Sequence, residues 1–244
     1  MSTLAAARPA RARLGRWPFD DEVVHLVLLD HHMVPTAADV AGWLREATEQ
    51  GARAVRTGAL FPDAVPPFLD AGFRVADRLA LLAAPVAGEH PTAAPRRPAA
   101  TTPIPTSIRL RRLRPSMLAE ASTIDRRAFA SPWANDVPAL ADIMTATPYH
   151  RSRSIHVAGR MVAFSISGRA DRTGYVQRLA VDPSARRQGL ASLLLDDARR
   201  WMQRRHVTRV MVNTAEDNRA ALALYESFGF ARQPGSLQIL ERTL

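Results

Sequence analysis

The chain has 244 residues, of which 47% are hydrophobic and 23% charged, a balance typical of a globular protein with one large or two small domains. It contains no cysteine, which excludes disulfides, thiolate metal sites and cysteine nucleophiles. All 33 basic residues are arginine, which excludes a Walker phosphate loop and a Schiff-base lysine. The net charge of +10 favours an anionic ligand, a nucleic acid or an acidic partner without choosing among them.

The N-terminus predicts a flexible basic tail over residues 1–17. It carries arginines but no continuous apolar run, and no later run approaches the ~20 apolar residues that a membrane-spanning helix needs. We therefore expect a cytoplasmic protein without a membrane segment.

Residues 18–84 predict a first half of alternating strands and helices. Thr36 and Asp39 have the spacing of a capping box, and Gly51 is a typical stop, so a helix is expected between them. The predicted elements are a strand at 23–29, a helix at 36–51, a strand at 53–60, a short helix at 62–73 and a strand at 78–84.

Residues 85–106 are rich in proline, alanine and threonine and show no periodicity, which predicts a linker. A second half, 107–244, follows with an α/β (α+β) pattern typical of a mixed sheet. Its predicted elements are a strand at 107–115, helices at 117–129 and 136–146, a hairpin at 153–168 turning near Gly159, a strand at 174–181, a long helix from 190, a strand at 208–214, a helix at 218–230, and strands at 230–233 and 237–242.

The two halves contain similar segments. Residues 53–73 and 209–230 share a strand, a helix and a terminal Gly-Phe, with one residue of slippage. Divergent duplication explains this match, and the alternative is that any strand-helix-strand unit looks alike. When the two segments are aligned, Phe68 corresponds to Tyr225.

The turn at 186–192, RRQGLAS, lies between a predicted strand and the long helix. Backbone N–H groups at the start of a helix are unpaired and lie at its positive end, so such a turn can hold phosphate oxygens. Gly189 permits a close approach of the backbone. The alternative is an ordinary helix cap.

In this context the second half resembles the GCN5-related N-acetyltransferase (GNAT) superfamily. The matching motifs are the strand VQRLAV, then Asp-Pro, then the turn RRQGLA and its helix, and about 25 residues later NRAALALYESFGF. The resemblance covers residues 107–244 and implies the GNAT acetyltransferase fold. With the first half it implies two GNAT-like halves in tandem, an arrangement similar to that of mycothiol synthase.

The resemblance implies acetyl-CoA as the co-substrate and no metal. It assigns the pyrophosphate to the turn, the pantetheine arm to the strand before it, and the proton for the departing thiolate to Tyr225 as general acid. The implied cofactor-binding residues are Leu179, Ala180, Val181, Arg186, Arg187, Gln188, Gly189, Leu190, Ala191, Ser192, Asn218 and Tyr225. Two of these have alternatives, because Tyr225 also lies on an apolar stripe and Asn218 can simply cap its helix.

The chain departs from the family at the general base. Asn213 and Tyr175 stand where relatives carry a glutamate. An α-amino group, with a pKa of about 8, needs less help to lose its proton than a lysine near 10.4. Glu216, Asp217 or a chain of water molecules are the remaining candidates.

The first half lacks a glycine turn between its first strand and helix, and Phe68 removes the phenol. We therefore expect residues 18–84 to be a degenerate GNAT-like half without a coenzyme site. His31 and His32 have no further ligand at helical spacing, so we expect loop histidines rather than a metal site.

The leading hypothesis is an N-acetyltransferase that passes an acetyl group from acetyl-CoA to a primary amine in a ternary complex. The acceptor is a protein or peptide N-terminus or a small molecule. The alternative is a non-catalytic acyl-CoA-binding or scaffold module. Nucleic-acid binding is disfavoured because the arginine-rich segments lack aromatic interleaving and a reader motif. The sequence leaves the oligomeric state open.

Overall fold

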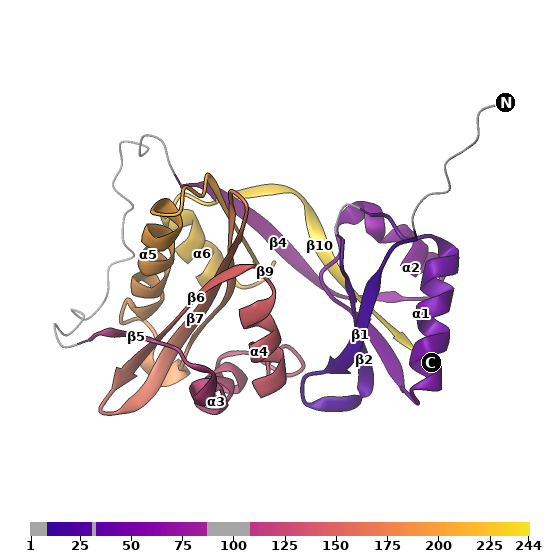
Figure 1. Ribbon diagram of the computed structural model, residues 1–244, viewed down its shortest axis with the longest axis horizontal. Coiled ribbons are helices and arrows are strands. Elements are labelled where there is room, and N and C mark those ends of the chain that lie inside the picture. Colours follow the sequence, from indigo (N-terminus) through magenta and orange to yellow (C-terminus); the bar gives the residue numbers. More distant parts are fainter. Residues whose placement is uncertain (1–8, 31–32, 87–107) are drawn as a thin grey trace. The chain divides into compact units, whose positions relative to one another are not determined.

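The computed structural model describes residues 9–30, 33–86 and 108–244 (Figure 1). The chain divides into two compact units. The first unit consists of Met1–Leu81, Ala215–Asp217 and Pro234–Leu244, and the second of Leu82–Thr214 and Asn218–Gln233. The predicted linker lies outside the described residues except at its first two positions, and so do His31 and His32.

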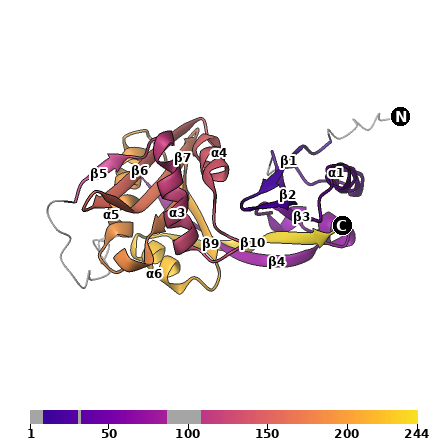
Figure 2. The ribbon, with the colours of Figure 1, turned by 90° about the horizontal axis from the view of Figure 1, so that it is seen from below.

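The first unit is a sheet with helices packed against it. Its elements are β1 (Ala12–Trp17), β2 (Asp20–Leu28), α1 (Ala37–Glu49), β3 (Ala54–Thr57), η1 (Pro62–Ala64), α2 (Pro66–Asp70), most of β4 (Arg74–Pro85) and most of β10 (Ala231–Thr243). β1 and β2 are antiparallel, whereas β2 and β3 are parallel and are connected through α1. β10 completes this unit by pairing antiparallel with β3 (Figure 2).

Helix α1 starts and ends where its sequence predicts. The Thr36 side chain accepts a hydrogen bond from the Asp39 N–H, and the Asp39 carboxylate accepts one from the Thr36 N–H, so the capping box is complete. Gly51 follows the helix with φ +76°. The helix buries one face in a core with the strands, through Val40, Leu44 and Ala47.

The second unit contains the longer elements. They are β5 (Leu110–Arg112), η2 (Pro115–Met117), α3 (Leu118–Ala128), α4 (Val137–Thr145), β6 (Tyr149–Val157), β7 (Arg160–Ala170), β8 (Thr173–Val181), η3 (Pro183–Ala185), α5 (Leu190–Gln203), β9 (Arg209–Ala215) and α6 (Arg219–Ser227). The strands are ordered β9-β8-β7-β6-β5. β6, β7 and β8 are antiparallel neighbours, and β8 and β9 are parallel.

The two faces of this sheet are covered by different helices. α3 and α4 pack on one face of β6–β8 and α5 on the other, and Figure 1 shows them on opposite sides of the strands. Phe164 and Ile166 point toward α3 and α4, whereas Ile155 and Ala163 point toward α5. α5 contributes a continuous buried stripe formed by Leu190, Leu194, Leu195, Ala198, Trp201 and Met202.

The two units repeat one topology. β1, β2, α1, β3, α2 and β4 follow the same order as β7, β8, α5, β9, α6 and β10. In both series the first two strands are antiparallel and the second and third are parallel. The correspondence extends to single residues at the ends of α2 and α6. The Phe73 N–H donates to the Phe68 carbonyl at 3.0 Å, and the Phe230 N–H donates to the Tyr225 carbonyl at 3.1 Å.

The rings of these pairs also correspond. The centroids of Phe68 and Phe73 lie 5.2 Å apart, and those of Tyr225 and Phe230 lie 5.6 Å apart. In both units a glycine with positive φ, Gly72 or Gly229, precedes the second ring. Phe68 therefore occupies in the first unit the position that Tyr225 occupies in the second.

Two boundaries differ from the sequence prediction. The expected tail over 1–17 is wrong for residues 12–17, which form β1 and pair with β2. The expected second half, 107–244, does not stay in one unit, because Pro234–Leu244 belong to the first unit. The two short strands expected near the C-terminus are one strand, β10. Residues 12–17 form a hairpin with the next strand, whereas β10 is placed by its pairing with β3, far away in the sequence.

Within the described part of the chain, none of the helices is both long and apolar enough to cross a membrane.

Candidate active site

Strands β8 and β9 separate along their length in the second unit. They pair in parallel only from Thr173 to Tyr175 on β8 and from Arg209 to Met211 on β9, although both strands continue beyond these residues. β8 therefore has a backbone edge without a β9 partner from Val176 onward.

The orientation of β8 decides which backbone groups line this edge. The Asp182 N–H donates to the carbonyl of Val162, at the start of β7, at 2.8 Å. Because successive residues of a strand direct their backbone groups to opposite sides, the N–H and C=O groups of Leu179 and Val181 point away from β7. Ala180 directs its backbone toward β7, and its side chain is buried toward α3. Of the three strand residues predicted to contact the pantetheine arm, only Leu179 and Val181 therefore direct their backbone groups toward the open edge.

The turn after β8 has an unusual backbone. Arg187 and Gly189 both lie in the left-handed region, with φ of 64° and 74°. This conformation costs a non-glycine residue about 1–2 kcal/mol. Alternation of left-handed and right-handed residues directs successive N–H groups to one side and forms a concave anion site. The strain at Arg187 is therefore consistent with a binding role.

The Asp182 side chain stabilises this turn. Its buried carboxylate accepts hydrogen bonds from the hydroxyl and the N–H of Ser184, at 2.6 and 2.9 Å, and contacts Arg127 at 2.9 Å. The Ser184 hydroxyl, followed by the Ser184 N–H and the nearby arginines, holds the pKa of Asp182 below its ordinary value despite burial. The Arg186 guanidinium also donates to the Ala128 carbonyl at 2.9 Å, which ties the turn to the end of α3.

The N-terminus of α5 has no side-chain cap and is called open below, whereas that of α1 is capped by its own side chains. Gly189 is the N-cap of α5, with no side-chain hydrogen bond to the helix and no acidic residue in the first turn. At the equivalent place in the first unit, Thr36 and Asp39 satisfy the N–H groups of α1 and add a negative charge. The positive end of α5 can therefore accept an anion, and the positive end of α1 is occupied by its own carboxylate.

Tyr225 lies on α6 and is buried, with 6% of its surface exposed. Burial raises the pKa of the phenol to about 12, and the nearby positive charge of Arg178 opposes part of this rise. The phenol is therefore protonated at neutral pH and can donate a hydrogen bond. Its hydroxyl makes no hydrogen bond to another described residue.

The remaining predicted site residues differ in how far their side chains are exposed to solvent. Arg186 and Arg187 are exposed, and Gln188 and Ala191 are partly exposed. The side chains of Leu190 and Ser192 are buried, so only their backbone N–H groups can face a ligand. The Asn218 side chain accepts from the Ala221 N–H at 3.2 Å and caps α6. Its cap role is thus observed, and its coenzyme contact stays a prediction.

The structure shows where the positions considered for a general base lie. Asn213 and Tyr175, which stand where relatives carry a glutamate, are exposed on β9 and partly exposed on β8. Glu216 and Asp217 are exposed, and the Glu216 carboxylate accepts a hydrogen bond from the Ser236 hydroxyl. These positions give no carboxylate a geometry that marks it as a base.

Sequence reasoning missed a buried ion pair beside the candidate site. Arg178 on β8 donates to both carboxylate oxygens of Asp125 on α3, at 2.6 and 2.7 Å, and to the Trp133 carbonyl at 2.9 Å. The guanidinium lies 3.6 Å from the centre of the Phe129 ring. This cluster connects β8 to the segment between α3 and α4. A charged residue within an otherwise apolar helix stripe, at Asp125, is the signal that could have revealed it.

Gln177, next to Arg178, is a second missed residue. Its Oε1 atom is buried and has no hydrogen-bond partner among the described residues. β7 and β8 change register at this point, with Gln177 as the extra residue, which is the pattern of a β-bulge. An unpaired acceptor thus lies on β8 just beyond the point where β9 diverges.

Replacement of Asp125 by asparagine is expected to destabilise the protein by about 3–5 kcal/mol, because it leaves the partly buried guanidinium of Arg178 without a countercharge. The midpoint of urea-induced unfolding measures this loss. The double variant Asp125→Leu/Arg178→Met removes both charges and should recover part of the stability. A double variant no more stable than Asp125→Asn would contradict the ion-pair explanation.

The match with a known protein family lies almost entirely within the second unit. Residues 127–230 match the model of the acetyltransferase (GNAT) family. This range contains α5, the preceding turn and Tyr225. All of it belongs to the second unit except for the short segment Ala215–Asp217.

Two curated relatives match over different lengths. The ribosomal protein bS18-alanine N-acetyltransferase of Escherichia coli (strain K12) is 32% identical over 46% of this chain and 74% of the relative. The mycothiol acetyltransferase of Salinispora arenicola (strain CNS-205) is 30% identical over 94% of this chain and 89% of the relative. The second match therefore includes both units.

Solved structures show a similar fold over nearly the whole chain. A tandem GNAT protein from the clavulanic acid biosynthesis pathway has a TM-score of 0.65 at 13% identity and covers 96% of this chain and 79% of its own. A GNAT protein from Sphaerobacter thermophilus has a TM-score of 0.59 at 15% identity over 96% and 76%. This likeness shows the fold. The match to the family model, together with the relative of 30% identity that is covered over 89% of its length, shows that the chain belongs to the GNAT family of N-acetyltransferases.

Proposed function

We propose that the second unit transfers an acetyl group from acetyl-CoA to a primary amine by direct attack in a ternary complex. The observation that carries the proposal is the open N-terminus of α5, reached through two left-handed residues, next to the unpaired backbone edge of β8. The acceptor is a peptide or protein N-terminus or a small-molecule amine. By their names, one of the relatives above acetylates an alanine of ribosomal protein bS18 and the other is a mycothiol acetyltransferase.

The residues present fit coenzyme A in two places. A diphosphate needs several converging N–H donors and positive charge, which residues 187–192 and the exposed guanidinium groups of Arg186 and Arg187 supply. The pantetheine arm carries amide groups, which can pair like a short strand with the backbone of Leu179 and Val181. Both sites lie at the same end of β8, so one extended ligand can occupy them together.

In the transfer step the amine nitrogen forms a bond to the thioester carbonyl carbon, and the carbon–sulfur bond breaks. The carbonyl oxygen gains negative charge on the way, and in this proposal a backbone N–H near Val181 donates a hydrogen bond to it. The sulfur leaves as a thiolate and takes the proton of the Tyr225 phenol. The nitrogen loses its extra proton to water or to a base, after which Tyr225 is reprotonated from solvent.

The proposal needs no dedicated carboxylate base for an α-amino acceptor. A group with a pKa of about 8 is partly deprotonated at neutral pH, whereas a lysine near 10.4 is almost fully charged. The absence of glutamate at Asn213 and Tyr175 therefore favours α-amino groups over lysine side chains. Oxygen acceptors such as Gln177 Oε1 can still hold the amine by a hydrogen bond.

We further propose that the first unit is a degenerate copy of the second. Phe68 occupies the position of Tyr225 and has no hydroxyl, and the capping box of Thr36 and Asp39 fills the place of an anion site. Both features disfavour coenzyme binding there while they preserve the fold. We propose that this unit instead supports the second unit or takes part in recognition of the acceptor.

The experiment is release of coenzyme A from acetyl-CoA with a panel of N-terminal peptides, polyamines and amino sugars, combined with calorimetric titration of coenzyme A. Turnover with at least one α-amino acceptor is expected, with a binding stoichiometry of one per chain. Binding without turnover on any amine would favour a non-catalytic acyl-CoA-binding module. No binding at millimolar coenzyme A would overturn the proposal.

A further inference from the structure

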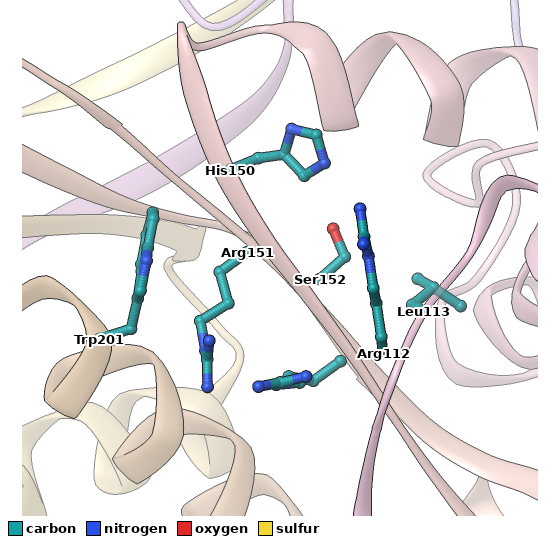
Figure 3. A pocket seen from close by; sticks show the side chains of 7 residues that line it. Arg112, Leu113, His150, Arg151, Ser152 and Trp201 are labelled. Atoms are coloured by element: carbon teal, nitrogen blue, oxygen red, sulfur yellow. The ribbon is translucent and has the colours of Figure 1, made fainter.

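A hollow of about 240 Å³ lies in the second unit where β5, β6 and the end of α5 meet. Figure 3 shows the side chains that line it. They are Arg112, Leu113, His150, Arg151, Ser152, Arg153 and Trp201. Most of these side chains are hydrogen-bond donors, and three of them carry a fixed positive charge.

The positive charges exceed the negative charge available to them. Asp197 on α5 accepts two hydrogen bonds from Arg151, at 2.7 and 2.9 Å, and one from Arg153 at 3.2 Å. Burial raises the pKa of Asp197, but hydrogen bonds and charge from the two arginines outweigh it, so the carboxylate stays ionised. Arg112 makes no ion pair with any described residue. Arg151 and Arg153 therefore share the one carboxylate of Asp197, whereas the Arg112 guanidinium lies beside His150 and Ser152 in Figure 3.

A buried hydroxyl adds a second indication of a ligand. Ser152 is only 5% exposed, and its Oγ atom has no hydrogen-bond partner among the described residues. In Figure 3 this hydroxyl points into the space between the His150 ring and the Arg112 side chain. A buried hydroxyl without a partner costs about 1–3 kcal/mol, and a bound acceptor would remove this cost.

The hollow is separate from the proposed coenzyme site. Trp201 lies eleven residues after Leu190 on α5, roughly 16 Å along the helix at about 1.5 Å per residue. Across the sheet, β7 lies between β6 and β8, which separates these strands by roughly 10 Å. A ligand here would not compete directly for the turn at 186–189.

We propose that this hollow binds the phosphate group of a small molecule, a second anion site beyond the proposed acetyl transfer. Guanidinium groups offer paired N–H donors that match phosphate oxygens. A phosphate in this hollow can pair with the Arg112 guanidinium and accept a hydrogen bond from the Ser152 hydroxyl, which lies on the other face of β6 from Arg151 and Arg153. The restricted volume favours a single phosphate group over a nucleic-acid backbone.

The test is titration of the full chain with inorganic phosphate, followed by NMR chemical shifts, in the Arg187→Gln background that weakens anion binding at the turn. Arg112→Gln is expected to raise the phosphate Kd about tenfold, the loss of one charge-assisted contact. Ser152→Ala should raise it several-fold. Arg111→Gln is the matched control, because Arg111 is a neighbouring exposed arginine of β5 outside the hollow, and it should leave the Kd unchanged.

The outcomes separate this site from the proposed function. Equal losses in Arg112→Gln and Arg111→Gln would show unspecific attraction by net charge and overturn the proposal, as would an absence of phosphate binding at 10 mM, about the weakest useful affinity. Tighter binding of a DNA oligonucleotide than of phosphate, lost in Arg112→Gln, would replace it with a nucleic-acid surface. Coenzyme A titration of Arg112→Gln should match the unaltered chain whichever result is found.

Discussion

Tyr225→Phe is expected to lower the turnover number about 100-fold or more while the KM for acetyl-CoA changes little. A positioned general acid contributes about 10²–10⁴-fold, and the phenol of Tyr225, whose pKa burial raises to about 12, carries a proton at neutral pH. Since no described residue hydrogen-bonds to the hydroxyl, its removal leaves the packing of the ring against Phe230 in place. Steady-state kinetics with the best acceptor of the panel measure the effect.

Two controls distinguish catalysis from packing. Thermal unfolding of Tyr225→Phe should match that of the unaltered chain, and Tyr225→Leu should lose stability as well as turnover because it removes the buried ring. The ultraviolet titration of the phenols should lose a component that ionises well above the ordinary tyrosine pKa of about 10. A Tyr225→Phe variant with normal turnover would show that the tyrosine only packs, and another proton donor would have to be sought.

Gly189→Ala is expected to weaken coenzyme A binding about tenfold or more. Gly189 has φ +74° at the N-cap of α5, a conformation that costs a residue with a side chain about 1–2 kcal/mol. Relief of this strain would turn the N–H groups of the turn away from one another, which weakens their joint contact with a diphosphate. Calorimetric titration of coenzyme A gives the change in Kd.

Gly51→Ala is the matched control for this prediction. Gly51 has a similar φ of +76°, follows α1 in the first unit and has open space around its Cα. Both substitutions should lower stability to a similar extent, but only Gly189→Ala should affect coenzyme A. Equal affinities in the two variants would mean that the turn at 186–189 does not hold the diphosphate.

Local sequence patterns were sufficient for the elements that carry the candidate site. The capping box at Thr36 and Asp39, the apolar stripe of α5 and the glycine turn before it depend on residues within a few positions of each other. The motif around Tyr225 likewise predicted a helix that ends at a Gly-Phe pair. Such patterns report local hydrogen bonds and one buried face, which do not require knowledge of distant partners.

Tertiary structure decided the features that depend on distant pairing. Residues 12–17 become β1 only because β2 offers a partner. β10 joins the first unit because it pairs with β3, where Glu241 lies opposite Arg56, 185 residues earlier in the chain. The buried pair of Asp125 with Arg178 and the hollow beside Arg112 bring together charges from separate elements. Short-range periodicity carries no information about such contacts, because the free energy that stabilises them comes from burial and pairing in the folded chain.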